Sequence, residues 1–229
     1  MQILKTLKYT FSIILILLSL VSYSQKREWH SLMVGADLSR FIVPIVDNTR
    51  YGWEISGTYE FMPDVFAKAE FGTQTTRFEE PRYHYHSNGA YTRLGVNYNY
   101  MKHIDPASSD KLFIGAMYGF TTFFQEADNI VLSSSIWNGI ENASIDRHWL
   151  AANWLEISTG MQAHIIQNFY LGWSVRFRIN IWQQNNPFMQ PYYVPGYGRA
   201  WSNSWVGFNY SIYYRIPFLR RRNNTEVLD

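Results

Sequence analysis

Charged side chains recur at every second position of otherwise apolar segments, and their types and spacing could do chemistry. The densest pair, Arg176 and Arg178, lies in segment 169–182, whose odd positions are all apolar. Alternate side chains of a strand point to opposite faces, so this segment is a strand with one apolar and one charged face. Acids and bases are similar in number, so we expect them to form ion pairs, with a proton or ion path as the alternative. The complete set is Asp37, Glu54, Glu60, Lys68, Glu70, Arg93, Glu156, Arg176, Arg178 and Arg215.

Histidines are weaker candidates for metal binding or catalysis. His84 and His86 flank Tyr85 and would point to one side of an extended segment. Two histidines need further ligands to hold a transition metal, and the sequence has no cysteine. A hydrolase set made of His86, Ser87 and Glu79 has nothing in the sequence to fix its geometry. We therefore expect surface histidines, no catalytic residues, no metal site and no cofactor.

Segment 169–182 is one of eight segments with alternating polarity. It is longer than a typical soluble strand, and its length suits the ~9–11 residues that cross a bilayer at a tilt. Long and short connections alternate, as in bacterial outer-membrane barrels with both termini in the periplasm. The sequence predicts an all-β fold, a transmembrane antiparallel up-and-down β-barrel of about eight strands. The expected strands are 30–39, 51–61, 65–75, 89–101, 111–124, 149–163, 169–182 and 201–216. The expected connections are 40–50, 62–64, 76–87, 102–110, 125–148, 164–168 and 183–199.

Alternation alone does not say which face meets lipid, because a soluble eight-stranded barrel such as a lipocalin turns its apolar face inward. Here the apolar faces carry almost no charge, the polar faces carry small residues such as Gly95 and Gly160, and aromatic residues gather near strand ends. These features favour lipid outside and the charged residues inside. Side chains fill the lumen of an eight-stranded barrel, so we expect a closed lumen in which Arg176 and Arg178 meet glutamates of neighbouring strands.

The connection 183–199 is rich in proline and aromatic residues. Exposed aromatic side chains on a stiff loop suit recognition of a protein partner or a glycan. The alternative is a loop that folds over the mouth of the barrel. The candidate binding residues are Phe188, Met189, Tyr192, Tyr193, Tyr197 and Arg199.

The first 24 residues have the parts of a secretory signal peptide: Lys5 and Lys8, the apolar run 11–21, and small residues before a cut. The apolar run is too short to span a bilayer as a helix, and an uncleaved anchor is the alternative. Removing the two lysines takes the net charge of +2 to zero, so the mature chain has no basic field for nucleic acid. The expected regions are a signal peptide at 1–24, an outer-membrane barrel at 25–218 and a basic periplasmic tail at 219–229.

Several motifs resemble a known family. They are Gly35–Ser39, His148–Leu150, Trp154–Glu156, Leu171–Arg176, Tyr193–Tyr197 and Val206–Tyr210. The sequence resembles outer-membrane β-barrel proteins of Bacteroidota that are classified as a domain of unknown function. The resemblance implies a fold and a location, but no activity. Gly207, Tyr210 and Ile212 also look like the signal that the barrel-assembly machinery reads, although here a tail follows them.

The expected function is that of a small outer-membrane barrel with a structural or loop-mediated binding role. Its expected partners are outer-membrane lipid and lipopolysaccharide, the barrel-assembly machinery during biogenesis, and a protein at the outer loops. The alternatives are a component of a secretion or uptake assembly, a narrow porin-like channel, and an enzyme that modifies lipid or lipopolysaccharide. The enzyme is the least favoured because no catalytic set converges in the sequence.

Overall fold

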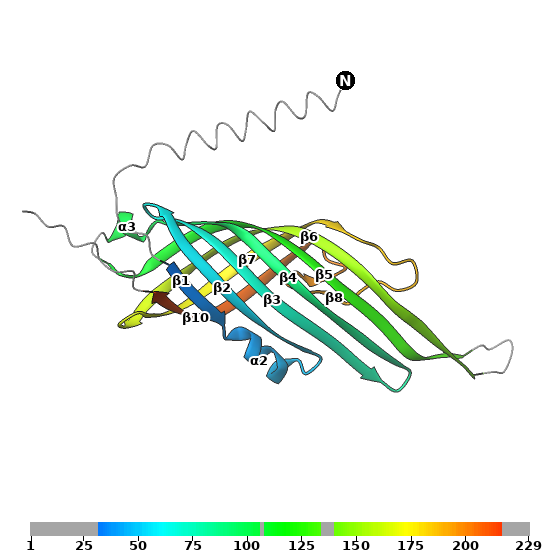
Figure 1. Cartoon of the computed structure of the whole chain (residues 1–229). Helices are drawn as coiled ribbons and strands as arrows, with labels where there is room; N and C mark the ends of the chain where they lie inside the picture. Colours follow the sequence, from blue (N-terminus) through cyan, green and yellow to red (C-terminus); the bar gives the residue numbers. More distant parts are fainter. Residues whose placement is uncertain (1–31, 106–107, 134–139, 217–229) are drawn as a thin grey trace, which may run out of the picture. The chain divides into compact units, whose positions relative to one another are not determined.

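The structure is a computed structural model that describes residues 32–105, 108–133 and 140–216. Eight of its strands form one closed barrel, shown in Figure 1. In order around the barrel these are β1 (Leu32–Asp37), β10 (Ser204–Ile216), β7 (Phe169–Gln183), β6 (Ile140–Ile166), β5 (Lys111–Ser133), β4 (Tyr83–Asn99), β3 (Val65–Glu80) and β2 (Arg50–Met62). The remaining elements are the helices α2 (Ser39–Val46) and α3 (Met101–Ile104) and the short strands β8 (Tyr193–Val194) and β9 (Gly198–Arg199).

The first and last barrel strands close the ring. β1 pairs with β10 from Leu32 opposite Ile216 to Asp37 opposite Ser211, and it pairs with β2 on its other edge. All neighbouring strands of the ring are antiparallel. The predicted eight-stranded antiparallel barrel is therefore confirmed.

The barrel has polar side chains on its inner face and apolar side chains on its outer face, the reverse of the arrangement in a soluble barrel. Arg93 and Glu156 on inward positions are 0% and 1% exposed, whereas Leu94 and Ile157 on the adjacent outward positions are 58% and 53% exposed. The alternation read from the sequence thus separates a polar interior from an apolar exterior. Within the described part of the chain, no helix is long and apolar enough to cross a membrane.

Several connections differ from the sequence-based expectation. The expected loop 76–87 shrinks to Pro81 and Arg82, because β3 and β4 continue to pair with each other, with Arg77 opposite His86. The expected connection 125–148 is likewise mostly strand, since β5 runs to Ser133 and β6 begins at Ile140. The polarity of these segments was misleading, because their outward face carries exposed charged residues such as Arg77 and Glu79, while Tyr85 and Ala127 on the inward face stay buried.

Two short helices also lie where connections were expected. α2 occupies most of the expected loop 40–50, and α3 lies in the expected turn 102–110. Loop 183–199 contains the small β8–β9 hairpin. The predicted signal peptide and basic tail lie outside the described residues.

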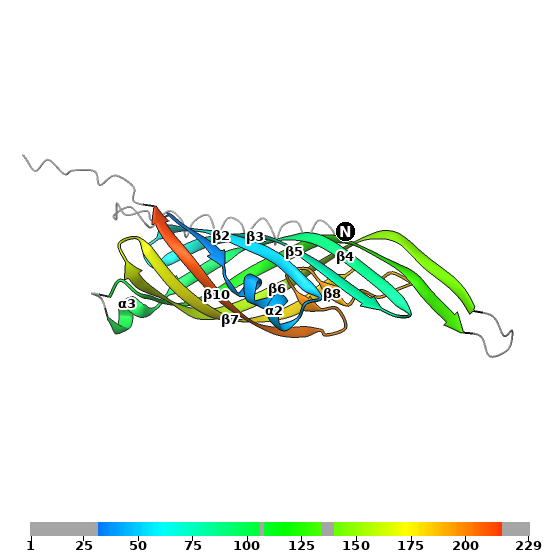
Figure 2. The same cartoon turned by 90° about the horizontal axis from the view of Figure 1, so that it is seen from below.

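Extended strands project from one end of the barrel. β5 and β6, with 23 and 27 residues, run past the other strands, as Figure 2 shows. We call residues 125–133 of β5 and 140–150 of β6 the outer hairpin. Pairing of β6 with β7 begins only at Ala152, opposite Gln183. No described strand covers the other edge of β6 within the outer hairpin.

The larger of two apolar clusters in the interior lies near the same end of the barrel. Trp154 is fully buried, together with side chains of β4, β5 and β6 and with Val194 and Tyr197 of the β8–β9 segment. Gly119 lies beside Trp154, and a Cβ atom on Gly119 would overlap the indole ring. Gly57 lies on β2, and a Cβ atom added to Gly57 would have no other atom within 4 Å.

The Gly119→Ala substitution is expected to destabilise the barrel by about 1–3 kcal/mol, because Trp154 must move to admit the new methyl group. Gly57→Ala is the matched control and should change the free energy of unfolding by less than about 0.5 kcal/mol. Denaturant titration of both refolded variants in detergent measures the difference. Equal stability of the two variants would contradict the packing of Trp154 described above.

Candidate functional site: a charged lumen and an outer hairpin

Arg93 on β4 is the centre of the charged lumen. Its guanidinium group lies 2.5 Å from Glu54 on β2, 2.7 Å from Glu70 on β3 and 3.3 Å from Glu156 on β6. All four side chains are almost fully buried. One arginine thus joins carboxylates from three other strands, and these contacts fill the lumen.

Arg176 and Arg178 on β7 complete this network in two different ways. Arg178 meets Glu156 at 2.8 Å on the neighbouring strand β6, as expected from the sequence. Arg176 instead binds both oxygens of Glu70, at 2.8 and 3.0 Å, on β3. β3 is not a neighbour of β7 in the ring, so the shortest contacts of Arg176 cross the lumen, while the glutamate of its neighbouring strand β6, Glu156, lies 3.5 Å away. A long arginine side chain spans the narrow lumen of an eight-stranded barrel, which strand adjacency does not predict.

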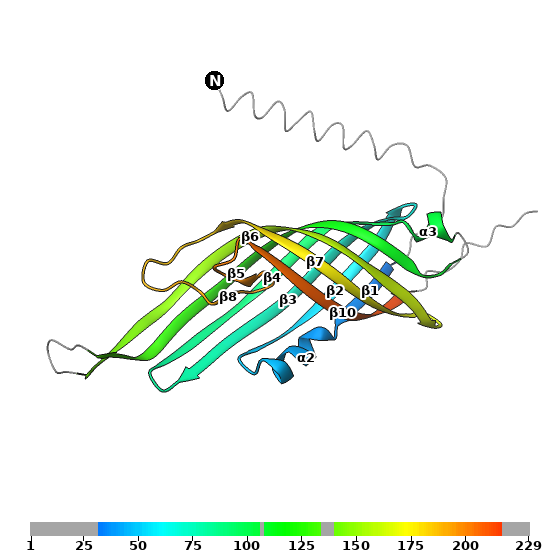
Figure 3. The same ribbon diagram turned by 180° about the vertical axis from the view of Figure 1, so that it is seen from behind.

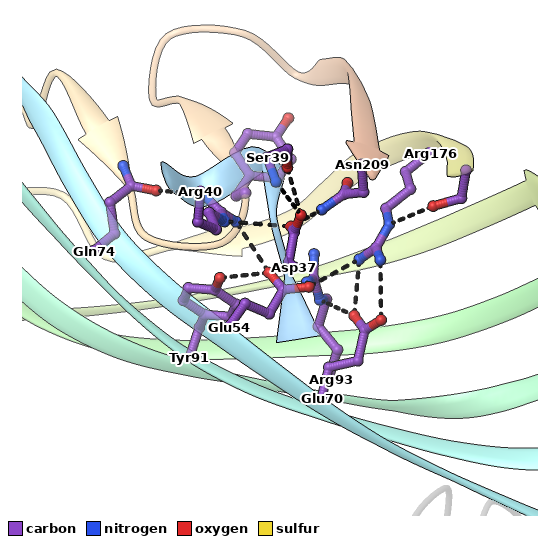
Figure 4. Close-up of polar contacts among 12 residues, drawn as sticks. Asp37, Ser39, Arg40, Glu54, Glu70, Gln74, Tyr91, Arg93, Arg176 and Asn209 are labelled. Atoms are coloured by element: carbon purple, nitrogen blue, oxygen red, sulfur yellow. Dashed lines mark hydrogen bonds and ion pairs between the residues drawn. The ribbon is translucent and has the colours of Figure 1, made fainter. Parts of the chain in front are cut away.

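Helix α2 contributes a cation that the sequence analysis placed in a loop. Arg40 on α2 donates to Glu54 at 3.1 Å and to Gln74 at 3.4 Å, and its Nε atom lies 3.7 Å from Asp37. Figure 4 shows Arg40 pointing toward the carboxylates of Asp37 and Glu54. The mostly apolar sequence between β1 and β2 gave no signal that Arg40 would enter the lumen.

Neutral side chains hold the carboxylates of the network. Tyr91 donates its hydroxyl proton to Glu54 at 2.6 Å, and Asn209 donates to Asp37 (Figure 4). Ser39 also donates to Asp37. The sequence did not single out these partners, because uncharged polar residues give no distinct signal in an alternating strand.

The remaining members of the predicted charged set lie around this centre. Lys68 is 2.8 Å from Glu70. Glu60 lies near the turn between β2 and β3, where it accepts a hydrogen bond from the Asp64 backbone. Arg215 stacks over the Tyr170 ring at 4.6 Å. The structure thus gathers eight of the ten predicted residues in or beside the central network and places Glu60 and Arg215 elsewhere.

The aromatic loop turns inward rather than outward. Tyr193 and Tyr197 are 8% and 1% exposed, and Tyr192 packs against the Tyr85 ring at 5.1 Å. Gly196 has a φ of +78° and lies against the Tyr91 ring, where any Cβ atom would clash. The expectation of an exposed recognition surface was therefore wrong for the tyrosines of this segment. The loop folded over the mouth is the arrangement found.

The other candidate residues of this loop stay near the surface. Phe188 is 73% exposed, and Arg199 is exposed and lies over the Trp201 and Trp205 rings. The backbone oxygen of Met189 accepts a hydrogen bond from Gln125 at 2.6 Å, which ties the loop to β5.

The two candidate histidines contact acids on β5 separately. His84 lies 2.9 Å from Asp128, and His86 lies 3.0 Å from Glu126. The described residues contain no group of three or more His, Cys, Asp or Glu side chains placed to hold a metal ion.

Exposed charges and aromatic rings cover the base of the outer hairpin. Arg147 donates two hydrogen bonds to Glu126, at 2.9 and 3.1 Å. These bonds, followed by the contact with His86, hold the pKa of Glu126 below its usual value. A hydrogen bond with Tyr192 and partial burial raise the pKa of Tyr83 to about 12. The pair of Glu126 and Arg147 therefore stays charged, and Tyr83 on β4 stays neutral, throughout the physiological pH range.

Comparison with known proteins gives a family without an assigned activity. The family model described as "Domain of unknown function (DUF6048)" matches residues 6–221. The chain belongs to this family. The expected membership of a family of unknown function is thus confirmed. No curated protein matches the sequence.

Solved structures of small outer-membrane barrels are similar in fold. The N-terminal β-barrel domain of OprF from Pseudomonas aeruginosa is 12% identical, over 81% of this chain and 97% of that chain, with a TM-score of 0.40. The Ail protein of Yersinia pestis, in complex with the heparin analogue sucrose octasulfate, is 15% identical over 82% and 97%, with a TM-score of 0.42. A major outer membrane protein from Thermus thermophilus is 10% identical over 82% and 98%, with a TM-score of 0.49.

The Arg176→Met substitution is expected to destabilise the barrel by roughly 3–5 kcal/mol, because it leaves the Glu70 carboxylate without its bidentate partner. Arg147→Met is the matched control: it breaks an exposed pair and should leave the denaturation midpoint nearly unchanged. Denaturant titration of the refolded chains measures both effects. Small and equal shifts would contradict a dry, closed lumen, because they would mean that water solvates Glu70.

Proposed function

We propose that the protein is a non-conducting outer-membrane barrel that presents its outer hairpin to a protein partner. One observation carries this proposal: ion pairs close the lumen, while the outer hairpin leaves one edge of β6 without a described partner strand. The barrel then serves as an anchor, and its projecting sheet is the part available for binding.

The exterior of the barrel supports a location in the outer membrane. Leu94, Ile157 and Val175, on three different strands, belong to a belt of exposed apolar side chains on the outer face of the barrel. Exposed aromatic residues lie near both ends of the strands, as at two membrane–water interfaces: Tyr59, Tyr98, Phe169 and Tyr214 at the end with short turns, and Trp149, Trp182 and Trp201 at the other. Short turns are periplasmic in bacterial barrels, so we expect both termini in the periplasm and the outer hairpin outside the cell.

The closed lumen argues against a porin-like role. Arg93 and Arg176 bridge opposite walls of the barrel, and the β8–β9 segment packs over one end of the interior. An ion would have to displace several buried ion pairs to pass, and each has a cost of several kcal/mol to break. The charged lumen therefore serves as the polar core of the barrel.

The free edge of β6 gives the outer hairpin a way to bind. An edge strand presents unpaired backbone N–H and C=O groups, and an extended segment of another protein can add to it as a further strand. Side chains beside this edge, including Arg147 and Trp149, are exposed and would select the partner. We therefore expect a protein partner with an extended segment, in addition to the lipid and lipopolysaccharide around the barrel and the assembly machinery that inserts it.

Photo-crosslinking in intact cells tests this proposal. A photoreactive amino acid at position 146, on the free edge of β6, is expected to give a discrete protein adduct that external protease removes. The same amino acid at position 155, on the lipid-facing side of β6, is the control and should give lipid adducts alone. A protein adduct at 155 without one at 146 would overturn the proposal and favour a component of a secretion or uptake assembly that packs through its lipid face.

A further inference from the structure

The barrel wall contains a gap that α2 covers. β1 ends at Asp37, whereas its neighbour β2 extends back to Arg50 and its neighbour β10 begins at Ser204. Seven residues of β10 and five of β2 therefore lie beyond the end of their pairing with β1. α2 packs against both strands at this place, and Figure 3 shows it beside β2 and β10 from the other side of the barrel.

Behind α2 lies a cavity of about 220 Å³. Three arginines line it: Arg40 from α2, Arg50 from β2 and Arg178 from β7. Gln74 and Asn209 add polar groups, and no Asp or Glu is among the lining residues. The cavity has room for a phosphate or carboxylate group with some water.

The ion pairs beside the cavity leave one positive charge in excess. The carboxylates of the central network number four, and its cations number five. They are Asp37, Glu54, Glu70 and Glu156 on one side and Arg40, Lys68, Arg93, Arg176 and Arg178 on the other. An uncompensated charge in a buried network is costly, so an anion at the cavity would stabilise it.

Two arginines of the network share their carboxylates and also line the cavity. Arg40 shares Glu54 with Arg93, and its buried Nε atom has no hydrogen-bond partner and lies 3.7 Å from Asp37. Arg178 shares Glu156 with Arg93 and also donates to the backbone oxygen of Tyr197 at 2.9 Å. Arg50 has its own partner, Asp47, at 2.6 Å. An anion in the cavity would therefore lie beside the two arginines that share their partners.

The outer wall of the cavity continues into the apolar exterior. Val206 and Phe208 of β10 line the cavity and are 61% and 62% exposed on the lipid-facing side. Ile45 and Val46, at the C-terminal end of α2, are 83% and 84% exposed. An amphiphile could therefore place its acyl chain along these residues and its headgroup among the arginines.

We propose that this cavity binds the anionic phosphate or carboxylate headgroup of an amphiphile. The excess positive charge, the arginine lining without carboxylates and the apolar outer wall together select a singly charged lipid over a neutral or zwitterionic one. Arg40 is the binding residue at the centre of the site, and α2 covers it from the membrane side.

Calorimetric titration of the refolded mature chain in an uncharged detergent tests the proposal. The probes are dihexanoylphosphatidylglycerol, dihexanoylphosphatidylcholine and inorganic phosphate. Phosphatidylglycerol is expected to bind with one site per chain, and phosphatidylcholine at least tenfold more weakly. If inorganic phosphate binds more weakly than phosphatidylglycerol, the anion that occupies the site belongs to a lipid. If the two bind equally well, the site takes a free anion.

Two variants and a control locate the site. Arg40→Gln is expected to weaken phosphatidylglycerol binding about tenfold or more, because it removes a charged hydrogen-bond donor. Val43→Glu places a carboxylate at the cavity and should abolish binding, while Arg82→Gln removes an exposed arginine elsewhere and should change the affinity less than twofold. Absence of saturable binding to the unaltered chain, or equal effects of Arg40→Gln and Arg82→Gln, would overturn the proposal.

The same samples separate this proposal from the proposed function. A heat-dependent shift in gel mobility shows that each chain has folded as a closed barrel in detergent. A folded chain that binds neither phosphatidylglycerol nor phosphate overturns the anion site and leaves the membrane location and the outer hairpin untouched.

Discussion

The fold depends on the mutual compensation of buried charges around Arg93. Burying a charged side chain without a partner costs several kcal/mol of desolvation free energy. In a barrel with an apolar exterior, the charged side chains of the membrane-spanning part can lie only in the lumen. Glu54, Glu70 and Glu156 each reach Arg93 from a different strand, so the ion pairs exist only when the sheet curves around the lumen as it does in the closed ring. Closure of the barrel and burial of the charges are therefore one event.

This constraint explains how the two ends of the barrel differ. Ion pairs fill the charged part of the lumen. Near the projecting strands, the lumen is filled by an apolar cluster that contains Trp154 and residues of the β8–β9 segment. Beyond that cluster β5 and β6 continue as a two-stranded sheet. The rigid interior can then support a projecting hairpin, and α2 covers the place where the short strand β1 leaves the wall incomplete.

The sequence revealed those features that depend on the two-residue period. The strand 169–182, the inward position of Arg178 and its pairing with Glu156 all follow from alternation and strand adjacency. Contacts that cross the ring do not, because the partner of Arg176 depends on the width of the lumen. Arg40 was missed for a similar reason: no period marks a helix of eight residues whose one polar face enters a barrel.

Loops gave the least reliable predictions. The polar segment 76–87 and the described parts of the connection 125–148 pair as strands, because backbone hydrogen bonds between strands do not require an apolar face. The aromatic composition of 187–199 was consistent with both an exposed and an inward loop, and packing against Tyr91 and Trp154 decides between them. Such packing depends on residues far away in the sequence, which composition alone does not reveal.

Single-channel conductance of the refolded mature chain in a planar bilayer tests the central claim most directly. The closed network predicts no openings of nanosiemens size for a sample whose heat-dependent gel mobility shows that it has folded. Stable openings of that size would contradict the account, because ions cannot pass at that rate through a lumen in which Arg93 and Arg176 stay paired with their carboxylates.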